Sequence, residues 1–434
     1  MAVPAGVSTE TAGSERSRLS RVLHALGPGL VFALTVGGPG SFVTNAAAGA
    51  MYGYALVWAL GLTVVFRYVW MSSSAKYVLI TGESLVEGYR RIARWLPWTV
   101  FGSAVLIRHV SNMYKVVLLG GCLNLLLPLP FAASAAIWSI LSVSLAFSMV
   151  FWGGYPVIEK CCKLFIALMS AGLAIAAVLS KADPLALLRA AIFPKVPQSH
   201  GIDALLLVMA LIGTDAGSLT NVTYSYFLRA KGWRSVEYLR RQRIDLLGSV
   251  VCIFCLGALV QVTAAASIHP LGIRVGTVED LMRVFSTTLG AAGRVIFSVG
   301  LWASAFAGYV GGMTGYGLIV TDVYRTSGRA PERRAGTPPA DPRRDPVFRW
   351  SVVFWSFSPL YVLLTKWEPV TLVIVLNTLM VVLIPVLAWA LLRLTNDRER
   401  MGRHANNWAT KTVFAVLIAT AIFLMARNLV ARLS

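Results

Sequence analysis

The sequence predicts an all-α polytopic membrane protein, and three observations lead to this fold class. First, 57% of the 434 residues are hydrophobic and only 13% are charged, which is too little polar surface to cover a soluble globule. Second, apolar runs long enough to cross a bilayer recur along the whole chain. Third, positive charges are concentrated in alternate loops between these runs, as in membrane proteins.

The apolar runs are each close to 20 residues or longer, the length of helix that crosses the roughly 30 Å hydrocarbon layer. Eleven are expected, at 27–50, 54–74, 98–127, 132–152, 161–180, 203–228, 244–268, 292–320, 348–365, 369–393 and 410–432. Residues 1–22, rich in Ser, Thr, Gly and Ala, are expected to form a disordered cytoplasmic tail before a transporter domain at 23–434. The Arg- and Pro-rich stretch 327–346 is expected to be a flexible inside loop.

The positive charges set the expected orientation. Most of the 39 Lys and Arg residues lie at 16–21, 90–94, 160–163, 229–243, 325–349 and 393–411, in alternate connections between the predicted spans and therefore on one side of the membrane. The positive-inside rule places these segments in the cytoplasm, so the amino terminus is cytoplasmic and the carboxyl terminus, after an odd number of spans, is outside. Because the net charge of +20 is distributed in this way, it indicates a multi-pass cell-membrane protein in a lipid bilayer, and no nucleic acid is expected as a partner. The oligomeric state stays open.

Two mid-span segments resemble each other and predict an internal repeat. Residues 37–45 read Gly-Gly-Pro-Gly-Ser-Phe-Val-Thr-Asn in the first run, and residues 214–221 read Thr-Asp-Ala-Gly-Ser-Leu-Thr-Asn in the sixth. Each has a Gly-Ser pair followed by Thr-Asn, five runs apart, as expected for two inverted halves that meet at discontinuous helices. We expect repeat one at 27–182, repeat two at 203–393 and an eleventh helix at 410–432, with helices unwound near Pro39 and Ala216.

These breaks are candidates for an ion-binding site. Gly and Pro leave backbone carbonyls and amides without helical partners, which a bilayer tolerates only where they line a cavity. The alternative is that they only kink the helices or allow close packing. Two similar breaks at corresponding places favour a site. Asp215 strengthens this interpretation, because an ionisable residue at mid-membrane costs several kcal/mol and is a functional candidate by default.

The chain resembles the natural resistance-associated macrophage proteins (NRAMP) over nearly its whole length. The resemblance is carried by residues 38–44, 48–50 and 53–54, which look like the family's Asp-Pro-Gly-Asn segment and its sequel, and by residues 154–160 and 401–408. The resemblance implies a LeuT-type fold of two inverted five-helix repeats plus an eleventh helix. It also implies import of manganese or iron coupled to protons.

The chain departs from the family pattern at its metal ligands. The family's first-helix Asp and Asn positions are Gly38 and Ser41 here, and its sixth-helix Met position is Gly217 or Ser218. The thioether that favours softer transition metals is absent, and the remaining oxygen ligands suit a hard ion such as Mg²⁺. The candidate ion-binding residues are Asp215, the expected metal ligand, with Thr214, Gly217, Ser218, Gly38, Ser41 and Asn377. Asn377 occupies the place of a family Gln.

Proton coupling is expected to be lost. The two acids of the family's third helix are Asn112 and Lys115 here, with Arg108 and His109 one turn earlier. Asn and Lys do not form an acid relay, and a cation there opposes a second cation nearby. His109 is the remaining coupling candidate because it titrates near neutral pH, although a plain hydrogen-bonded role is the alternative.

The expected function is transport of a divalent metal cation of the Mg²⁺ or Mn²⁺ type without proton coupling, closer to the magnesium transporters related to the family. No cofactor is expected, because the cation is the substrate. Two alternatives stay open: transport of another small solute on the same fold, or a non-transporting protein that binds or regulates. An enzyme is not expected, since the sequence offers no Ser-His-Asp set, zinc-ligand spacing or phosphate loop in a suitable context.

Overall fold

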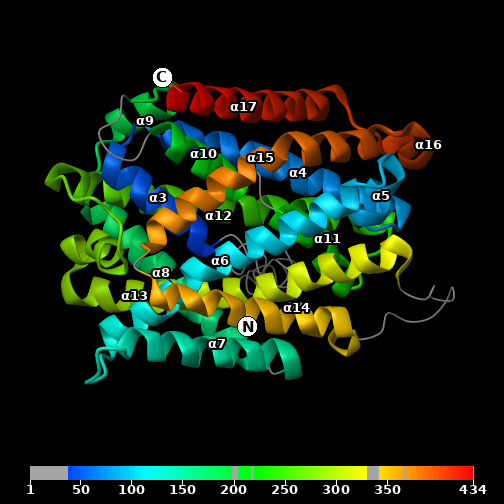
Figure 1. Ribbon diagram of the computed structural model, residues 1–434. Helices are drawn as coiled ribbons and strands as arrows, with labels where there is room; N and C mark the ends of the chain where they lie inside the picture. The colour runs from blue at the N-terminus through cyan, green and yellow to red at the C-terminus, as the bar shows by residue number, and fades with distance from the viewer. Residues whose placement is uncertain are drawn as a thin grey trace, which may run out of the picture.

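The computed structural model describes residues 38–153, 155–197, 204–216, 219–329, 342–365 and 367–433, and this part of the chain is helical without strands (Figure 1). The long helices are α3 (Gly38–Tyr52), α4 (Val57–Thr81), α6 (Leu96–Leu126), α7 (Ser134–Trp152), α8 (Tyr155–Leu179), α10 (Ala204–Asp215), α11 (Thr220–Ala230), α12 (Leu239–Ser267), α13 (Val278–Tyr324), α14 (Pro346–Phe357), α15 (Pro369–Asn396) and α17 (Trp408–Leu433). The shorter elements are α5 (Leu85–Ile92), α9 (Pro184–Ile192), α16 (Arg398–Met401), η1 (Val236–Tyr238), η2 (His269–Leu271), η3 (Arg325–Arg329), η4 (Pro342–Arg344), η5 (Ser358–Leu364) and η6 (Gly402–His404).

Each of the eleven predicted runs contains a helix. The sixth run holds two, because α10 ends at Asp215 and α11 begins at Thr220, so the predicted break near Ala216 is present. In the first run α3 is continuous from Gly38, and the part of the run before it, like the tail at 1–22, lies outside the described residues. The unwinding expected near Pro39 therefore stays a prediction.

The packing of the helices has the reciprocity of two inverted halves. Helix α3 packs on α12, and the corresponding α10 and α11 pack on α4. Three further contacts have an equivalent in the other half. The contact of α6 with α7 corresponds to that of α13 with α14, and the contact of α13 with α8 corresponds to that of α6 with α15. The contact of α12 with α8 corresponds to that of α4 with α15. Helix α6 packs along α13 and joins the halves, whereas α17 lies outside them against α15, α4 and α10 (Figure 1).

Three details differ from the expected boundaries. The helix expected at 292–320 extends back to Val278 and is kinked at Gly290, whose φ of 62° is one that glycine adopts readily. The short helices α5 and α9 were not expected. Helix α5 begins at a capping box, because Ser84 accepts from the Glu87 amide and Glu87 accepts from the Ser84 amide. Helix α9 follows the end of α8 at an angle of 108°.

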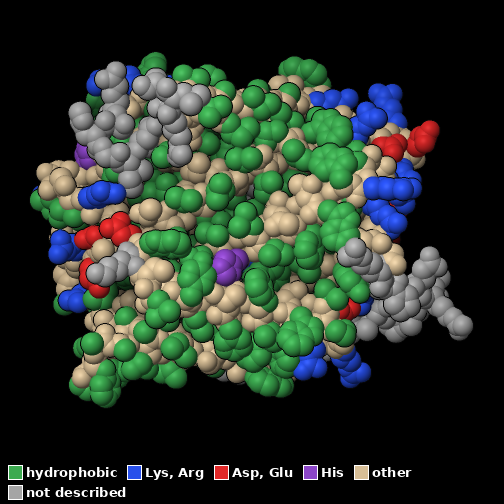
Figure 2. Space-filling view, in the orientation of Figure 1, with side chains coloured by type: hydrophobic (Ala, Val, Ile, Leu, Met, Phe, Trp, Pro, Cys, Tyr) green, Lys and Arg blue, Asp and Glu red, His purple; other side chains and the backbone are tan. Residues whose placement is uncertain are grey.

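The described helices divide into strongly apolar spans and more polar ones. Six helices are long and apolar enough to cross a membrane, or seven if the bent pair Ala167–Leu179 and Pro184–Ile192 forms one span. Helices α4 and α6 are long enough to cross a membrane but less apolar than these six, because they carry buried charged side chains such as Arg67 and Arg108. Hydrophobic side chains cover the middle of the surface in Figure 2, with Lys and Arg gathered toward its two sides. The count of eleven spans stays a prediction.

Candidate functional site

The first-helix segment begins α3 and is buried. Pro39 stands in the first turn of the helix, where a missing backbone N–H costs nothing. Ser41 is buried, and both its carbonyl and its hydroxyl oxygen accept from the side-chain amide of Asn45, at 2.8 and 3.1 Å. The Asn45 Oδ1 atom is buried and has no hydrogen-bond partner among the described residues. Neutral oxygen atoms therefore gather at this end of α3.

Asn377 of α15 reaches the same segment. Its Nδ2 donates to Thr44 Oγ1 at 3.1 Å, and Thr44 Oγ1 donates to the Gly40 carbonyl at 2.8 Å. Because the amide nitrogen is engaged with α3, the carbonyl oxygen of the Asn377 side chain is left as an acceptor. The structure thus brings together Asn377 and the segment that contains Ser41, as the sequence predicts.

The sixth-helix break lies beside the same part of α15. A Cβ atom added to Gly213 would lie 1.8 Å from the backbone carbonyl oxygen of Asn377, so the backbones of α10 and α15 touch here. The next residue, Thr214, is half-buried and donates its hydroxyl to the Ala210 carbonyl at 2.7 Å. Helices α3, α10 and α15 therefore meet around Asn377. On α10 the meeting point is Gly213, two residues before Asp215.

The break itself is partly described. The amide of Ala216 donates to the Ile212 carbonyl at 2.8 Å, and its carbonyl accepts from Asn221 Nδ2 at 3.2 Å, so the side chain of Asn221 spans the break. Asp215 is the last residue of α10; its side chain, and the whole of Gly217 and Ser218, lie outside the described residues. The roles expected for these three residues stay predictions.

Helix α6 presents a positively charged stripe to the interior. Arg108, Asn112 and Lys115 follow at helical spacing and are all buried. Arg108 donates to the carbonyls of Gly308 and Tyr309 on α13 at 3.2 and 2.8 Å. Asn112 donates to the Trp355 carbonyl at 2.8 Å, and Lys115 donates to Ser111 Oγ at 2.8 Å. Within the described residues, neither cation has a carboxylate partner.

Two glycines permit this arrangement. A Cβ at Gly312 would lie 1.7 Å from the Arg108 guanidinium, so only glycine lets that group reach the α13 backbone. On the other side, a Cβ at Gly40 would lie 3.1 Å from the Tyr114 hydroxyl. Tyr114 thus connects the α6 stripe to the first-helix segment, a role that sequence reasoning missed. Its only sequence signal is its position next to Lys115.

His109 lies elsewhere. Its Nδ1 atom is 2.9 Å from Ser358 Oγ, and its ring stacks on Phe354 and Tyr361, so it is held by α14 and η5. These contacts are not with α3, α10 or α15, and among the described residues none of them is with another predicted site residue. Successive residues on a helix point in directions about 100° apart, so His109 faces a different neighbour from Arg108.

The described residues contain no group of three His, Cys, Asp or Glu side chains that could hold a metal ion. Around Asn377 the available ligands are hydroxyl, amide and backbone oxygens, and Asp215 follows two residues after Gly213, which touches the Asn377 backbone. Such oxygen ligands suit hard cations that keep part of their water.

The family model for natural resistance-associated macrophage protein-like proteins (Nramp) matches residues 29–431. The divalent metal cation transporter MntH of Aeromonas hydrophila is 25% identical over 421 residues, which cover 94% of this chain and 96% of that protein. MntH of Deinococcus radiodurans is 27% identical over 317 residues, 70% of each chain.

Two solved structures resemble this fold. A crystal structure of the Eremococcus coleocola manganese transporter matches with a TM-score of 0.68 at 16% identity, over 97% of this chain and 87% of that one. MhsT in complex with L-phenylalanine matches with a TM-score of 0.59 at 13% identity, over 93% of this chain and 98% of that one. These likenesses confirm the predicted LeuT-type fold.

Proposed function

Since this chain belongs to the natural resistance-associated macrophage protein-like (Nramp) family, we propose that it carries a divalent metal cation across a membrane. Its MntH relatives are named as divalent metal cation transporters, which supports a transporter and not an enzyme. The metal is the cargo of such a protein, so no resident cofactor is needed. The charge pattern supports a cell-membrane location with the basic loops inside.

The observation that carries this proposal is the meeting of α3, α10 and α15 around Asn377. Asn377 Nδ2 donates to Thr44, which leaves its Oδ1 atom to accept from a hydrated cation or to coordinate it. Ser41 is buried about one turn before Thr44 on α3, and α10, which packs on α3, ends at Asp215. We assign Asp215 as the charged ligand and these oxygens, with Thr214, Gly217, Ser218 and the Gly38 backbone, as neutral ligands.

The proposed ion is Mg²⁺ or Mn²⁺. Carboxylate, carbonyl and water oxygens suit both ions, whereas a softer metal would gain from a thioether ligand, and the sixth-helix position of the family's Met is Gly217 or Ser218 here. With only one carboxylate, the ion would keep several water molecules, and hydrogen bonds from these waters to Asn377 and Ser41 would hold it.

We propose that protons do not drive the transport. A relay needs titratable groups connected by hydrogen bonds or water. On α6 the relevant positions are Asn112, which donates to a backbone carbonyl, and Lys115, which donates to Ser111. His109 contacts α14 and η5 and has no described link to the break after Asp215.

The test is ion uptake into proteoliposomes, measured for Mg²⁺, Mn²⁺ and Ca²⁺ with and without a pH gradient. We expect saturable uptake driven by the metal gradient alone, and a loss of about tenfold or more in Asp215→Asn. Asp183→Asn, at the start of α9, is the matched control, because an asparagine there still caps the helix. Uptake undiminished in Asp215→Asn would exclude the proposed site.

A second candidate is transport of an anionic or organic solute. The observation that favours it is the buried pair Arg108 and Lys115, which hydrogen-bond only neutral oxygens among the described residues. Buried cations without a carboxylate raise the cost of placing a divalent cation nearby. Uptake of radiolabelled amino or organic acids, with no uptake of any divalent metal, would favour this candidate.

A further inference from the structure

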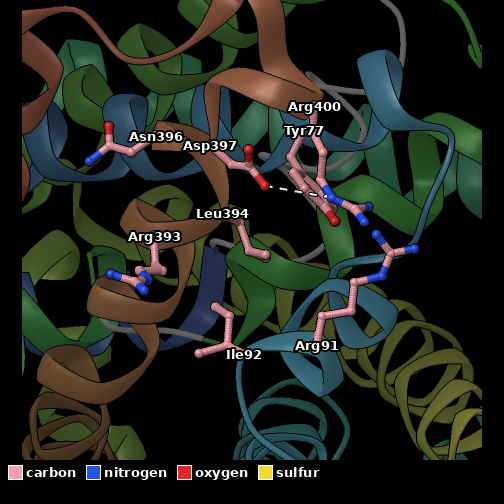
Figure 3. Close-up of a pocket in the computed structure, with 8 residues that line it drawn as sticks. All are labelled: Tyr77, Arg91, Ile92, Arg393, Leu394, Asn396, Asp397 and Arg400. Atoms are coloured by element: carbon pink, nitrogen blue, oxygen red, sulfur yellow. Dashed lines mark ion pairs between the residues drawn. The ribbon is translucent and has the colours of Figure 1, made fainter.

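A basic cavity lies where the ends of α4, α5, α15 and α16 meet, away from the break after Asp215. It has a volume of about 480 Å³, and its lining is shown in Figure 3: Tyr77, Arg91, Ile92, Arg393, Leu394, Asn396, Asp397 and Arg400. The lining holds three arginines and one aspartate, and with the Glu83 carboxylate beside it the positive charges exceed the negative ones by one.

Two of the arginines are held in place by one carboxylate beside the cavity. Glu83 accepts from Arg91 and from Arg400, with Arg400 Nη1 at 3.2 and 3.3 Å from its two oxygens. The Tyr77 hydroxyl also donates to Glu83, at 2.8 Å, and Asp397 lies 3.5 Å from Arg400 Nε. In Figure 3 the guanidinium groups of Arg91 and Arg400 lie side by side.

This arrangement leaves donors unused. Each guanidinium carries five N–H donors in a fixed plane, and the contacts with Glu83 and Asp397 use only some of those on Arg91 and Arg400. Arg393 is exposed and forms no ion pair with any described residue. The three side chains therefore offer several N–H groups to a ligand that presents several acceptor oxygens.

The rest of the lining is apolar or neutral. Ile92 and Leu394 provide apolar surface next to the arginines, and the Oδ1 atom of Asn396 is buried without a hydrogen-bond partner in the described part of the chain. The side of the cavity formed by α5 and α16 also belongs to the end of the molecule that carries Arg90, Arg398 and Arg403, the end that the positive-inside rule assigns to the cytoplasm.

We propose that this cavity binds a phosphate group through Arg91, Arg393 and Arg400. Planar guanidinium groups match phosphate oxygens in pairs, and basic pockets between membrane helices on the cytoplasmic side take up anionic head groups. The adjacent apolar surface fits a phosphate attached to a lipid, and a free phosphate would use the same N–H donors. The proposal does not depend on which solute the protein transports.

The test uses full-length protein purified in detergent and depleted of lipid. Retention of added phosphatidylglycerol is measured by native mass spectrometry against phosphatidylcholine, and binding of inorganic phosphate is measured by calorimetry. We expect Arg393→Gln and Arg400→Gln each to bind about fivefold more weakly than wild type. Arg398→Gln is the matched control, because this exposed arginine lies on α16 but does not line the cavity.

The variants separate ligand loss from misfolding. Arg393 makes no described ion pair, so its replacement should leave the melting temperature within about 2 °C of wild type, as for a surface change. Selective loss of phosphatidylglycerol in Arg393→Gln identifies a lipid head group, and selective loss of inorganic phosphate identifies the free ion. Equal binding by Arg393→Gln, Arg400→Gln and Arg398→Gln, or no binding by wild type, would overturn the proposal.

Discussion

Two neighbouring parts of the protein interior differ in charge. Around Asn377, where α3, α10 and α15 meet, the described polar groups are neutral oxygens and amides, most of them hydrogen-bonded within or between helices. On α6, Arg108 and Lys115 bring two cations into an equally buried setting. Tyr114, whose hydroxyl lies against Gly40, separates them. A cation would be stabilised by the first region and repelled by the second, so affinity depends on their balance.

The largest effect after that of Asp215 should come from disrupting the backbone contact between α10 and α15 beside Asn377. Gly213→Ala adds a methyl group where the Asn377 carbonyl oxygen is only 1.8 Å away, so α10 and α15 must separate. We expect a destabilisation of about 1–3 kcal/mol and near-complete loss of uptake. Gly61→Ala is the control, because nothing lies within 4 Å of the new methyl group. Thermal unfolding and uptake assays decide it: equal behaviour of the two variants would contradict this contact.

Removing the charge of Lys115 on α6 should increase metal affinity instead of reducing it. Lys115→Met keeps the length and apolar packing of the side chain but removes its charge. If the α6 stripe repels a bound cation, the apparent affinity for Mg²⁺ or Mn²⁺ should rise about tenfold. Concentration dependence of uptake measures this, with the exposed Lys411→Met as the control. A lower affinity in Lys115→Met would mean that the ammonium group supports binding.

A smaller effect is expected from the amide that joins α15 to α3. Asn377→Ala removes the 3.1 Å hydrogen bond to Thr44 and the acceptor oxygen beside it, which should weaken metal affinity about fivefold. Thr378→Ala, on the next residue, removes only a 3.4 Å contact with Leu206 and should change affinity little. Equilibrium metal binding compares the two. If Thr378→Ala proves the more harmful, Asn377 is not a ligand.

The smallest effect is expected at His109. Because its ring is held between Phe354 and Tyr361, away from the neutral region, His109→Ala should leave the pH dependence of uptake unchanged. A pH-sensitive dye in the vesicle lumen provides the measurement, with His404→Ala as the second histidine variant. Metal-dependent acidification that disappears only in His109→Ala would identify this residue as a proton carrier.

The sequence predicted the helices better than their contacts. Long apolar runs and the Gly-Ser pair after Ala216 were sufficient to predict the helices and the sixth-helix break, because both depend on local composition. The capping box at Ser84 and Glu87 would also have predicted α5. In contrast, the bond between Asn377 and Thr44 joins residues far apart in the chain, and no local pattern specifies which faces of two helices meet.

The same limit explains His109 and Tyr114. Neighbouring helix positions differ in direction by about 100°, so residues 108, 109 and 114 contact different elements although they are close in sequence. Spacing placed His109 near the site, whereas the structure turns it toward Ser358. The resemblance to a known family pointed to Asn377 because it added a third helix to the two of the repeat pattern, and its role as a ligand stays a prediction.

Arg108 also has a mechanical consequence. Its guanidinium donates to two consecutive carbonyls of α13 through the space that Gly312 leaves open, and the rings of Tyr309 and Tyr316 lie 5.9 and 5.7 Å from it. Sliding α6 along α13 would break charge-assisted bonds inside a low-dielectric interior, which is costly. These two helices, one from each half, should therefore move as a single rigid body. Any change between outward-open and inward-open states must then be accommodated by hinges outside this contact between α6 and α13.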